Sequence, residues 1–446
     1  MDILSIVAIA IFAVTLFLMI KRPWGIKLGY AAGIGAAASL LLGTVSLGQA
    51  AESFLNIWDA ALAFIGIVAL SVVLDAMGFF KWAALCVVRL AKGSGVRLYF
   101  YVSLLTAAVS ILFANDSAVL ILTPIVLEII SQLKIDGKGR YAYLFAAGLI
   151  ADTAAMPLIT SNPINILSAD FFGYTFIDHL VFMAPVAVAT IASSLLLVYL
   201  FFRKKIPKTY DAKLVDILSA GSVPISRGML SVCLGTLVAI DVGYLVASLY
   251  RIPVSVVICS GAVFLLAVYL ASLNGEIIRG ERKGLKGLAK DINWDIVLFM
   301  LSIFIVVQGL ATAGITNLLA SALDTTSKLP SALGIFAPSM VVTVGASFMN
   351  NWPMTILGLL SIQQIGATGT QLTGLVFSNV IGNNLGPHFF PLGSLAILMW
   401  LETMRKKGVN ISLKQYLKVG AVVSIAEVAV ASLVLWLELC AGFQLF

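Results

Sequence analysis

Long apolar runs recur along the whole chain, and short polar stretches separate them. A helix that crosses a bilayer needs about 20 mostly apolar residues, and about ten runs approach that length. The first run, residues 3–20, follows an acidic start without a small-residue cleavage site, so we expect a retained span and not a signal peptide. The pattern predicts an all-α polytopic membrane protein.

The composition agrees with a chain embedded in lipid. Of its 446 residues, 61% are hydrophobic and 11% are charged, and the mean hydropathy is +1.06. A soluble domain carries about 25% charged residues. No segment has the composition of a separate soluble domain, so the chain is expected to lie in a lipid bilayer throughout.

Lysine and arginine occur in clusters between the apolar runs. All of them except Arg251 and Lys328 belong to these clusters. The positive-inside rule places such clusters in the cytoplasm. The net charge of +7 therefore reflects topology and gives no reason to expect a nucleic-acid partner, and both termini are predicted to be extracytoplasmic. The clusters cover residues 21–27, 81–97, 134–140, 203–227, 279–290 and 405–418.

Two intervals leave one side of the membrane and return to it. The interval 98–133 lies between two basic clusters and has Asn115, Asp116 and Ser117 at its midpoint. Each leg has about 17 residues, the short limit for a span. We predict a re-entrant helical hairpin, and two full spans joined by a tight outer turn remain the alternative. The interval 331–367 is predicted to form a second hairpin from the opposite side.

Two further intervals have a length that fits neither one span nor two. As one helix, residues 140–172 would measure about 50 Å. Their middle carries polar residues together with Pro157 and Pro163. The interval 371–402 repeats this pattern around the sequence NNLGPHFFP. Each interval is predicted to be a helix broken inside the bilayer.

The two halves of the chain match each other. Residues 57–78 align without gaps to residues 293–314, and the charge rule gives these spans opposite directions. Inverted repeats with broken helices near the midplane are typical of secondary transporters. The predicted pairs are Trp58 with Trp294, Asp59 with Asp295, Gly78 with Gly314, Asn115 with Asn350, and Asp152 with Asn383.

These matches predict a domain organisation. An N-terminal repeat, 1–202, contains the first hairpin and the first broken helix. A cytoplasmic linker, 203–227, joins it to a C-terminal inverted repeat, 228–446, with the second hairpin and the second broken helix.

The hairpin tips and the breaks carry the candidate site. Helix ends inside a membrane need capping, and Asn, Asp and Ser are good N-caps, so capping alone is the simplest explanation of each polar residue. The argument for a site is convergence of symmetry-paired helix ends. The candidate cargo-binding residues are Asn115, Ser117, Thr153, Ser161, Asn162, Asn350, Asn351, Asn383 and Asn384, and the candidate proton-coupling residues are Asp116 and Asp152.

The other acidic, histidine and cysteine residues are not expected to bind cargo. Asp59 and Asp295, beside tryptophans at span starts, are expected to be interfacial anchors. His388, at a break, is expected to be either a proton relay or a plain hydrogen-bond donor, and Glu427 in the last span receives no role. The chain has four dispersed cysteines without CxxC or metal-ligand spacing, so we expect no metal, cofactor, disulfide or thiolate site. With no HExxH and no Ser-His-Asp grouping that can be placed, we do not expect an enzyme.

At the tips and breaks the sequence resembles the ArsB family of bacterial arsenite efflux pumps. The resemblance covers nearly the whole chain and includes FANDSAVLILTPIV, ADTAAMPLITSNPINILSADFF, MNNWPMTILGLLSIQ and NVIGNNLGPHFFPLGSLAILMW. It implies proton-coupled export of trivalent arsenite and antimonite across the bacterial inner membrane. In some relatives a soluble ATPase docks on the cytoplasmic side.

The residue types at the breaks fit such a cargo. Arsenite near neutral pH is mostly an uncharged trihydroxide, which needs paired hydrogen-bond donors and acceptors. The predicted breaks contain no lysine or arginine, which argues against a carboxylate cargo, although helix N-termini can bind carboxylates alone. A sodium/proton or carboxylate transporter of the same superfamily remains the alternative.

Overall fold

The structure is a computed structural model that describes residues 3–135, 137–211, 225–273 and 283–446. Residues 212–224 of the expected linker lie outside the described residues. So do Lys213, Arg279 and Arg282 of the basic clusters.

The described residues before the linker form helices and helical turns. With 30 residues, α3 is long enough to cross the membrane as a tilted helix. The elements of this half are α1 (Ile3–Lys21), η1 (Pro23–Gly25), α2 (Leu28–Leu41), α3 (Leu47–Ala76), α4 (Phe79–Ala91), α5 (Gly95–Phe113), α6 (Asn115–Gln132), α7 (Arg140–Phe145), η2 (Ala146–Ile150), α8 (Ala151–Thr153), η3 (Ile159–Ser161), α9 (Pro163–Phe172) and α10 (Phe176–Phe202).

The second half repeats this succession of helices. Its elements are α12 (Arg227–Leu249), α13 (Val254–Ser272), α14 (Leu285–Asp291), α15 (Trp294–Thr312), α16 (Ile315–Ser327), α17 (Leu333–Met349), α18 (Asn351–Ile365), α19 (Gly369–Phe389), η4 (Pro391–Gly393), α20 (Leu395–Lys406) and α21 (Leu413–Cys440).

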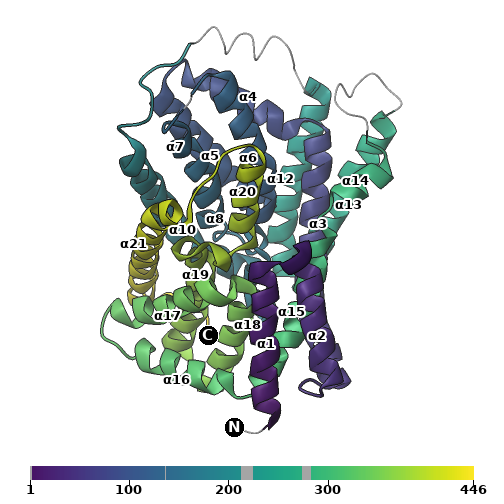
Figure 1. Cartoon of the computed structure of the whole chain (residues 1–446), viewed down its shortest axis with the longest axis vertical. Helices are drawn as coiled ribbons and strands as arrows, with labels where there is room; N and C mark the ends of the chain where they lie inside the picture. The colour runs from purple at the N-terminus through teal and green to yellow at the C-terminus, as the bar shows by residue number, and fades with distance from the viewer. Residues whose placement is uncertain (1–2, 136, 212–224, 274–282) are drawn as a thin grey trace.

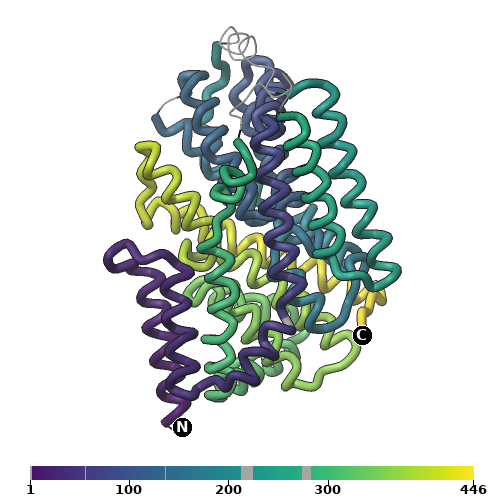
Figure 2. Tube along the Cα trace, turned by 90° about the vertical axis from the view of Figure 1, so that its right-hand side faces the viewer, coloured from purple at the N-terminus to yellow at the C-terminus, as the bar shows by residue number. Residues whose placement is uncertain are grey.

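The prediction of an all-α polytopic membrane protein is confirmed. Within the described ranges, 9 helices are long and apolar enough to cross a membrane, and α2 and α17 are shorter apolar helices. Both chain ends lie in the lower part of Figures 1 and 2, whereas α4 lies at the top of Figure 1.

Two helical hairpins lie at opposite ends of the molecule. α5 and α6 occupy the upper half of Figure 1, and α17 and α18 occupy the lower half. The first hairpin turns at Ala114 (φ 65°, ψ 153°) and the second at Asn350 (φ 79°, ψ 150°). Because both tips use the same rare backbone conformation, the structure pairs Ala114 with Asn350. The expected pairing of Asn115 with Asn350 is therefore wrong by one position.

The same register continues through the rest of each half. Gly78 (φ 84°, ψ 13°) and Gly314 (φ 80°, ψ 12°) precede α4 and α16 in one left-handed conformation. The interval from Ala114 to Asp152 equals the interval from Asn350 to His388, and each of these two residues is the last but one of its helix. Asp152 therefore corresponds to His388, and its expected pairing with Asn383 is wrong. At the first tip, the sequence alignment drifted because Asn115 matches Asn350 one position away from the register of the backbone.

Both broken helices restart at a side-chain cap. After the first break, the Asn162 side chain accepts a hydrogen bond from the Ile164 amide, and Pro163 occupies the first turn. After the second break, Ser394 accepts from the Ile397 amide. These caps satisfy backbone donors that would otherwise be unpaired far from water.

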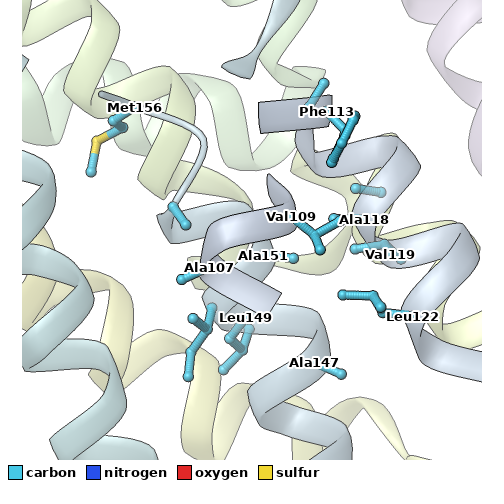
Figure 3. Close-up of a cluster of buried hydrophobic side chains, with 14 of the residues drawn as sticks. Ala107, Val109, Phe113, Ala118, Val119, Leu122, Ala147, Leu149, Ala151 and Met156 are labelled. Carbon is cyan, nitrogen blue, oxygen red and sulfur yellow. The ribbon is translucent and has the colours of Figure 1, made fainter. Parts of the chain in front are cut away.

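The first hairpin packs against the first broken helix through small side chains. Ala107 of α5, Ala118 of α6, and Ala147 and Ala151 of η2 and α8 are at most 5% exposed, and Figure 3 shows them in one cluster. Small side chains let helix backbones approach closely in a membrane. This packing holds the tip of the hairpin beside the break.

The two halves cap each other's helices. The Asp59 carboxylate on α3 accepts from the Ser255 amide at the start of α13, at 3.0 Å. The Asp295 carboxylate on α15 accepts from the Gly29 amide at the start of α2, also at 3.0 Å. Both aspartates were expected to be interfacial anchors, and the structure instead gives each a helix N-terminus as its partner. Gly29 has no alternative there, because a Cβ would lie 2.4 Å from the Asp295 carbonyl oxygen.

The hairpin arrangement predicts opposite accessibility of the segments that follow α6 and α18. We expect single cysteines at Lys138 and Thr370, in a protein without its native cysteines, to react with an impermeant maleimide from the cytoplasmic and the outer side respectively. Both positions are exposed, and they avoid the neighbouring Gly137 and Gly369, whose positive φ would strain a side chain. Labelling of both cysteines from one side would contradict the opposite orientation of the hairpins.

Candidate functional site

The tip of the first hairpin meets the first break at a carboxylate. The Asn115 side-chain amide donates to Asp152 Oδ1 at 2.6 Å, and Ser394 of the second break donates to the same oxygen at 3.4 Å. All three side chains are at most 3% exposed. The structure thus brings together elements from both halves around Asp152, as the convergence argument expected.

A second acid and a histidine continue this cluster. His388 Nε2 lies 3.6 Å from Asp152 Oδ2, and His388 Nδ1 lies 2.7 Å from Glu427 Oε2 on α21. The Thr153 hydroxyl lies 2.7 Å from the other Glu427 oxygen. Sequence reasoning gave Glu427 no role. The signal was present, since an ionisable residue inside a span is by default a candidate functional residue.

An amide cluster links the first break to α19. The Asn162 side-chain amide donates to Asn384 Oδ1 at 3.0 Å, and Asn384 donates in turn to Asn165 Oδ1 at 2.9 Å. Asn383 donates to Asn379 Oδ1 at 2.9 Å. Asn165 and Asn379 were not among the candidates, because each lies about one helical turn from a candidate asparagine, Asn162 or Asn383.

The two asparagines of the second tip make different hydrogen bonds. Asn350 Oδ1 accepts from the Trp352 amide at 3.2 Å and so caps α18. Asn351 is a good N-cap residue type just before Trp352 and Pro353, but it does not cap this helix. Its Oδ1 is buried and accepts no hydrogen bond from the described residues, like Asn383 Oδ1 and Asp152 Oδ2. Among the remaining candidates, Ser161 donates to the Ile111 carbonyl at 2.8 Å, which is a structural contact.

Asp116 and Ser117 face a cavity and not the Asp152 cluster. The cavity has a volume of about 290 Å³, and Asp75, Lys283 and Asp291 also line it. Lys283 belongs to a basic cluster expected in the cytoplasm. Asp116 is nevertheless close enough to Asp152 for their charges to interact. The first tip therefore separates a buried carboxylate from one that borders a cavity.

A larger cavity lies between the end of the first broken helix and α3. Its volume is about 690 Å³, and Asp59, Asp170, Tyr174, Arg251 and Gln308 are among its lining residues. Arg251 is one of the few basic residues outside the clusters, so this cavity is expected to face the outer side.

Acidic, cysteine and histidine side chains offer no metal centre in the described part of the chain. No three of them are close enough to hold an ion there. Cys86, Cys233, Cys259 and Cys440 are free thiols on four different helices.

A model of the ArsB family, described as arsenical pump membrane protein, matches residues 7–439. This chain belongs to the ArsB family. The resemblance seen in its tips and breaks is thereby confirmed. The chain is 39% identical to an arsenical pump membrane protein of Escherichia coli over 96% of its own length and 98% of the relative's. It is 38% identical to an arsenical pump membrane protein of Yersinia enterocolitica, with the same coverage.

One solved structure has a fold similar to that of this ArsB chain. The crystal structure of the Alcanivorax borkumensis YdaH transporter, described as having an unusual topology, matches with a TM-score of 0.56 and 13% identity over 88% of each chain. At that identity the likeness shows the fold alone. Family membership makes the chain a multi-pass membrane transporter and not an enzyme.

The second tip predicts separable effects for its two asparagines. Asn350→Ala should lower the thermal stability of purified protein, by about 1 kcal/mol for the lost cap. The alanine itself is tolerated in this backbone conformation, as Ala114 shows. Asn351→Ala should leave stability nearly unchanged and weaken cargo binding, because its free oxygen caps nothing. Thermal melting and transport assays on both variants test this. A stability loss for Asn351→Ala equal to that of Asn350→Ala would contradict the division.

Proposed function

We propose that this chain exports trivalent arsenite and antimonite, as their neutral hydroxides, in exchange for protons. Membership in the ArsB family supports the cargo class. The observation that supports the chemistry is that three buried acceptors of the candidate residues, Asn351 Oδ1, Asn383 Oδ1 and Asp152 Oδ2, have no hydrogen-bond partner among the described residues. A trihydroxide brings three O–H donors to such acceptors. Leaving them unpaired would cost about 1–3 kcal/mol each.

The proposed cargo path uses the two hairpins and the two breaks. We infer inverted repeats over 1–202 and 228–446, joined by the linker 203–227, with the hairpins entering from opposite sides. The shared register of Ala114 with Asn350 and the reciprocal caps of Asp59 and Asp295 support this arrangement. Transport then exposes the central amide and carboxylate groups alternately to each side.

Proton coupling is assigned to Asp116 and Asp152. Export of a neutral molecule against its gradient needs a coupled ion, because the membrane potential exerts no direct force on neutral cargo. Asp116 borders the cavity that faces the expected cytoplasmic side, and Asp152 is 1% exposed beside Asn115. A proton on a carboxyl group removes an acceptor from the cargo, so proton and cargo compete. The bacterial inner membrane as location and a soluble ATPase as cytoplasmic partner are part of the same proposal.

Transport should not depend on thiol chemistry. A protein with Cys86, Cys259 and Cys440 replaced by serine, and the buried Cys233 by alanine, should confer arsenite resistance on a sensitive strain at the level of the native protein. Alanine suits position 233, whose sulfur packs 3.4 Å from Met77 Sδ. Loss of resistance in a variant that is folded and inserted would point to thiolate capture of arsenic.

The Asp116 carboxyl should be needed for coupling and not for folding. Asp116→Asn keeps the hydrogen-bonding shape but cannot titrate, so we expect loss of arsenite accumulation driven by a pH gradient in everted vesicles. Exchange of labelled arsenite without a gradient should continue. Asp152→Asn is the comparison: normal pumping by Asp116→Asn and failure of Asp152→Asn would assign the proton to Asp152 alone.

If both asparagine variants pump normally, proton coupling through these acids is wrong. A requirement for a sodium gradient in the native protein would favour the alternative, a sodium-coupled transporter of the same superfamily.

A further inference from the structure

Glu427 is a fully buried carboxyl group that the proposed function does not use. It lies on α21, and its side chain is 0% exposed. Its oxygens contact His388 of α19 and Thr153 of α8. Among the described residues, His388 is the one side chain able to carry a positive charge that pairs with Glu427 or with Asp152. Two buried carboxylates with no other cation are costly unless protons or an imidazolium compensate them.

The Thr153 hydroxyl can satisfy Glu427 in either protonation state. Thr153 Oγ1 lies 2.7 Å from Glu427 Oε1 and 2.9 Å from the Leu149 carbonyl oxygen, but a hydroxyl has one proton to donate. When Glu427 is ionised, Thr153 donates to it. When Glu427 carries a proton on Oε2, that proton faces His388 Nδ1 and Oε1 still accepts from Thr153. Neither state leaves a buried donor unpaired at this contact.

His388 connects Glu427 to Asp152 through its two ring nitrogens. Nδ1 is at hydrogen-bond distance from Glu427 Oε2, 2.7 Å, whereas the 3.6 Å between Nε2 and Asp152 Oδ2 is too long for a hydrogen bond. Neither Nε2 nor Oδ2 has another hydrogen-bond partner among the described residues. In this conformation the ring is joined to Glu427 and separated from Asp152 by a small gap.

We propose that Glu427 is a second proton-binding residue of the transport cycle and exchanges a proton with Asp152 through His388. This inference rests on the proposed proton-coupled export. In the transfer, protonated Asp152 gives its proton from Oδ2 to His388 Nε2, and His388 gives the proton on Nδ1 to Glu427 Oε2. Asp152 becomes ionised, Glu427 becomes neutral and the ring stays neutral as its other tautomer. The reverse transfer restores the starting state.

The groups around the relay are consistent with this exchange. Tyr416 of α21 faces both acids, but its hydroxyl donates to the Pro387 carbonyl at 2.9 Å. Asp116 acts on Asp152 from the hairpin tip, and the Leu149 carbonyl faces the imidazole ring. The relay therefore moves the proton away from Asn115 and the cargo candidates of the first tip, and leaves Asp152 Oδ2 free to accept a hydrogen bond from cargo.

The test uses native protein and Glu427→Gln in everted membrane vesicles with radiolabelled arsenite. Glutamine keeps the size and hydrogen bonding of neutral Glu427 but takes up no proton. With a pH gradient, we expect vesicles with Glu427→Gln to accumulate no more arsenite than vesicles with native protein accumulate without a gradient. Arsenite exchange at equal pH should continue. Arsenite-induced infrared difference spectra should contain a band of a protonated carboxyl group in the native protein that Glu427→Gln lacks. Glu438→Gln, which removes a carboxyl group farther along α21, is the matched control and should behave as native.

Two further substitutions test the hydroxyl contact. Thr153→Val removes the hydroxyl at nearly constant volume and should shift the pH dependence of accumulation, whereas Thr153→Ser should keep the native profile. Native accumulation and pH dependence in Glu427→Gln would overturn the proposal. The proposal would also be overturned if Glu427→Gln and Glu427→Asp, both folded, each lost exchange as well as accumulation. Glu427 would then have a structural role. If the native protein itself shows no gradient-driven accumulation, the proposed function fails first.

Discussion

Every helix end inside a membrane must find its hydrogen-bond partners within the protein, and the rest of this structure depends on that constraint. The chain interrupts its helices at two hairpin tips and two breaks. Asn350, Asn162 and Ser394 cap three of the new helix starts, and at the first tip Asn115 Oδ1 accepts from the Asp116 amide at 2.9 Å. The same demand concentrates amide, hydroxyl and carboxyl groups where the interruptions meet. A polar centre is thus a consequence of breaking helices in hydrocarbon.

The two halves share the backbone conformation of their hairpin tips but differ in side-chain chemistry at corresponding positions. Ala114 stands where the second half has Asn350, and Asp152 stands where it has His388. The backbone therefore requires neither an acid nor a base at the broken helix. Placing an acid on one side and an imidazole on the other gives Asp152 a neighbour from the opposite half that can accept a proton from it. A strict repeat with two acids would leave that pair of buried carboxylates without a partner.

Length and charge were enough to indicate where the chain turns back in a helical hairpin and where a helix is interrupted. Burying unpaired backbone groups or charges in lipid is costly, so the length of an apolar run and the position of basic clusters limit how the chain can cross the membrane. The intervals 98–133 and 331–367 could therefore be recognised as segments that return to the side they left. The pairing of residues between halves could not be predicted as well. Neighbouring amides such as Asn350 and Asn351 are interchangeable in an alignment, but only one has the backbone conformation of the tip. Glu427 and His388 lie 39 positions apart in the sequence, and no periodicity predicts that α19 and α21 bring them to 2.7 Å.

The partners of Asp59 and Asp295 also could not be predicted from the sequence. Sequence placed both residues correctly at equivalent span starts, but their function is set by helices of the opposite half. A carboxylate beside tryptophan has an adequate explanation at the membrane interface, so nothing local points to Ser255 or Gly29. The reciprocal caps tie α3 to α13 and α15 to α2. Each half thus depends on the other for the start of one helix.

Hydrogen-bond polarity gives a physical basis for coupling a neutral cargo to a proton. Three unpartnered atoms of the candidate residues, Asn351 Oδ1, Asn383 Oδ1 and Asp152 Oδ2, are acceptors, and a trihydroxide is rich in donors. A proton on Asp152 converts that acceptor into a donor, which opposes an O–H group of the cargo at the same place. The discrimination needs no net charge on the cargo, because a mismatched buried hydrogen bond costs about 1–3 kcal/mol. A carboxyl group among amides is therefore a sufficient exchanger for the proposed cargo, and a cationic clamp would add nothing to it.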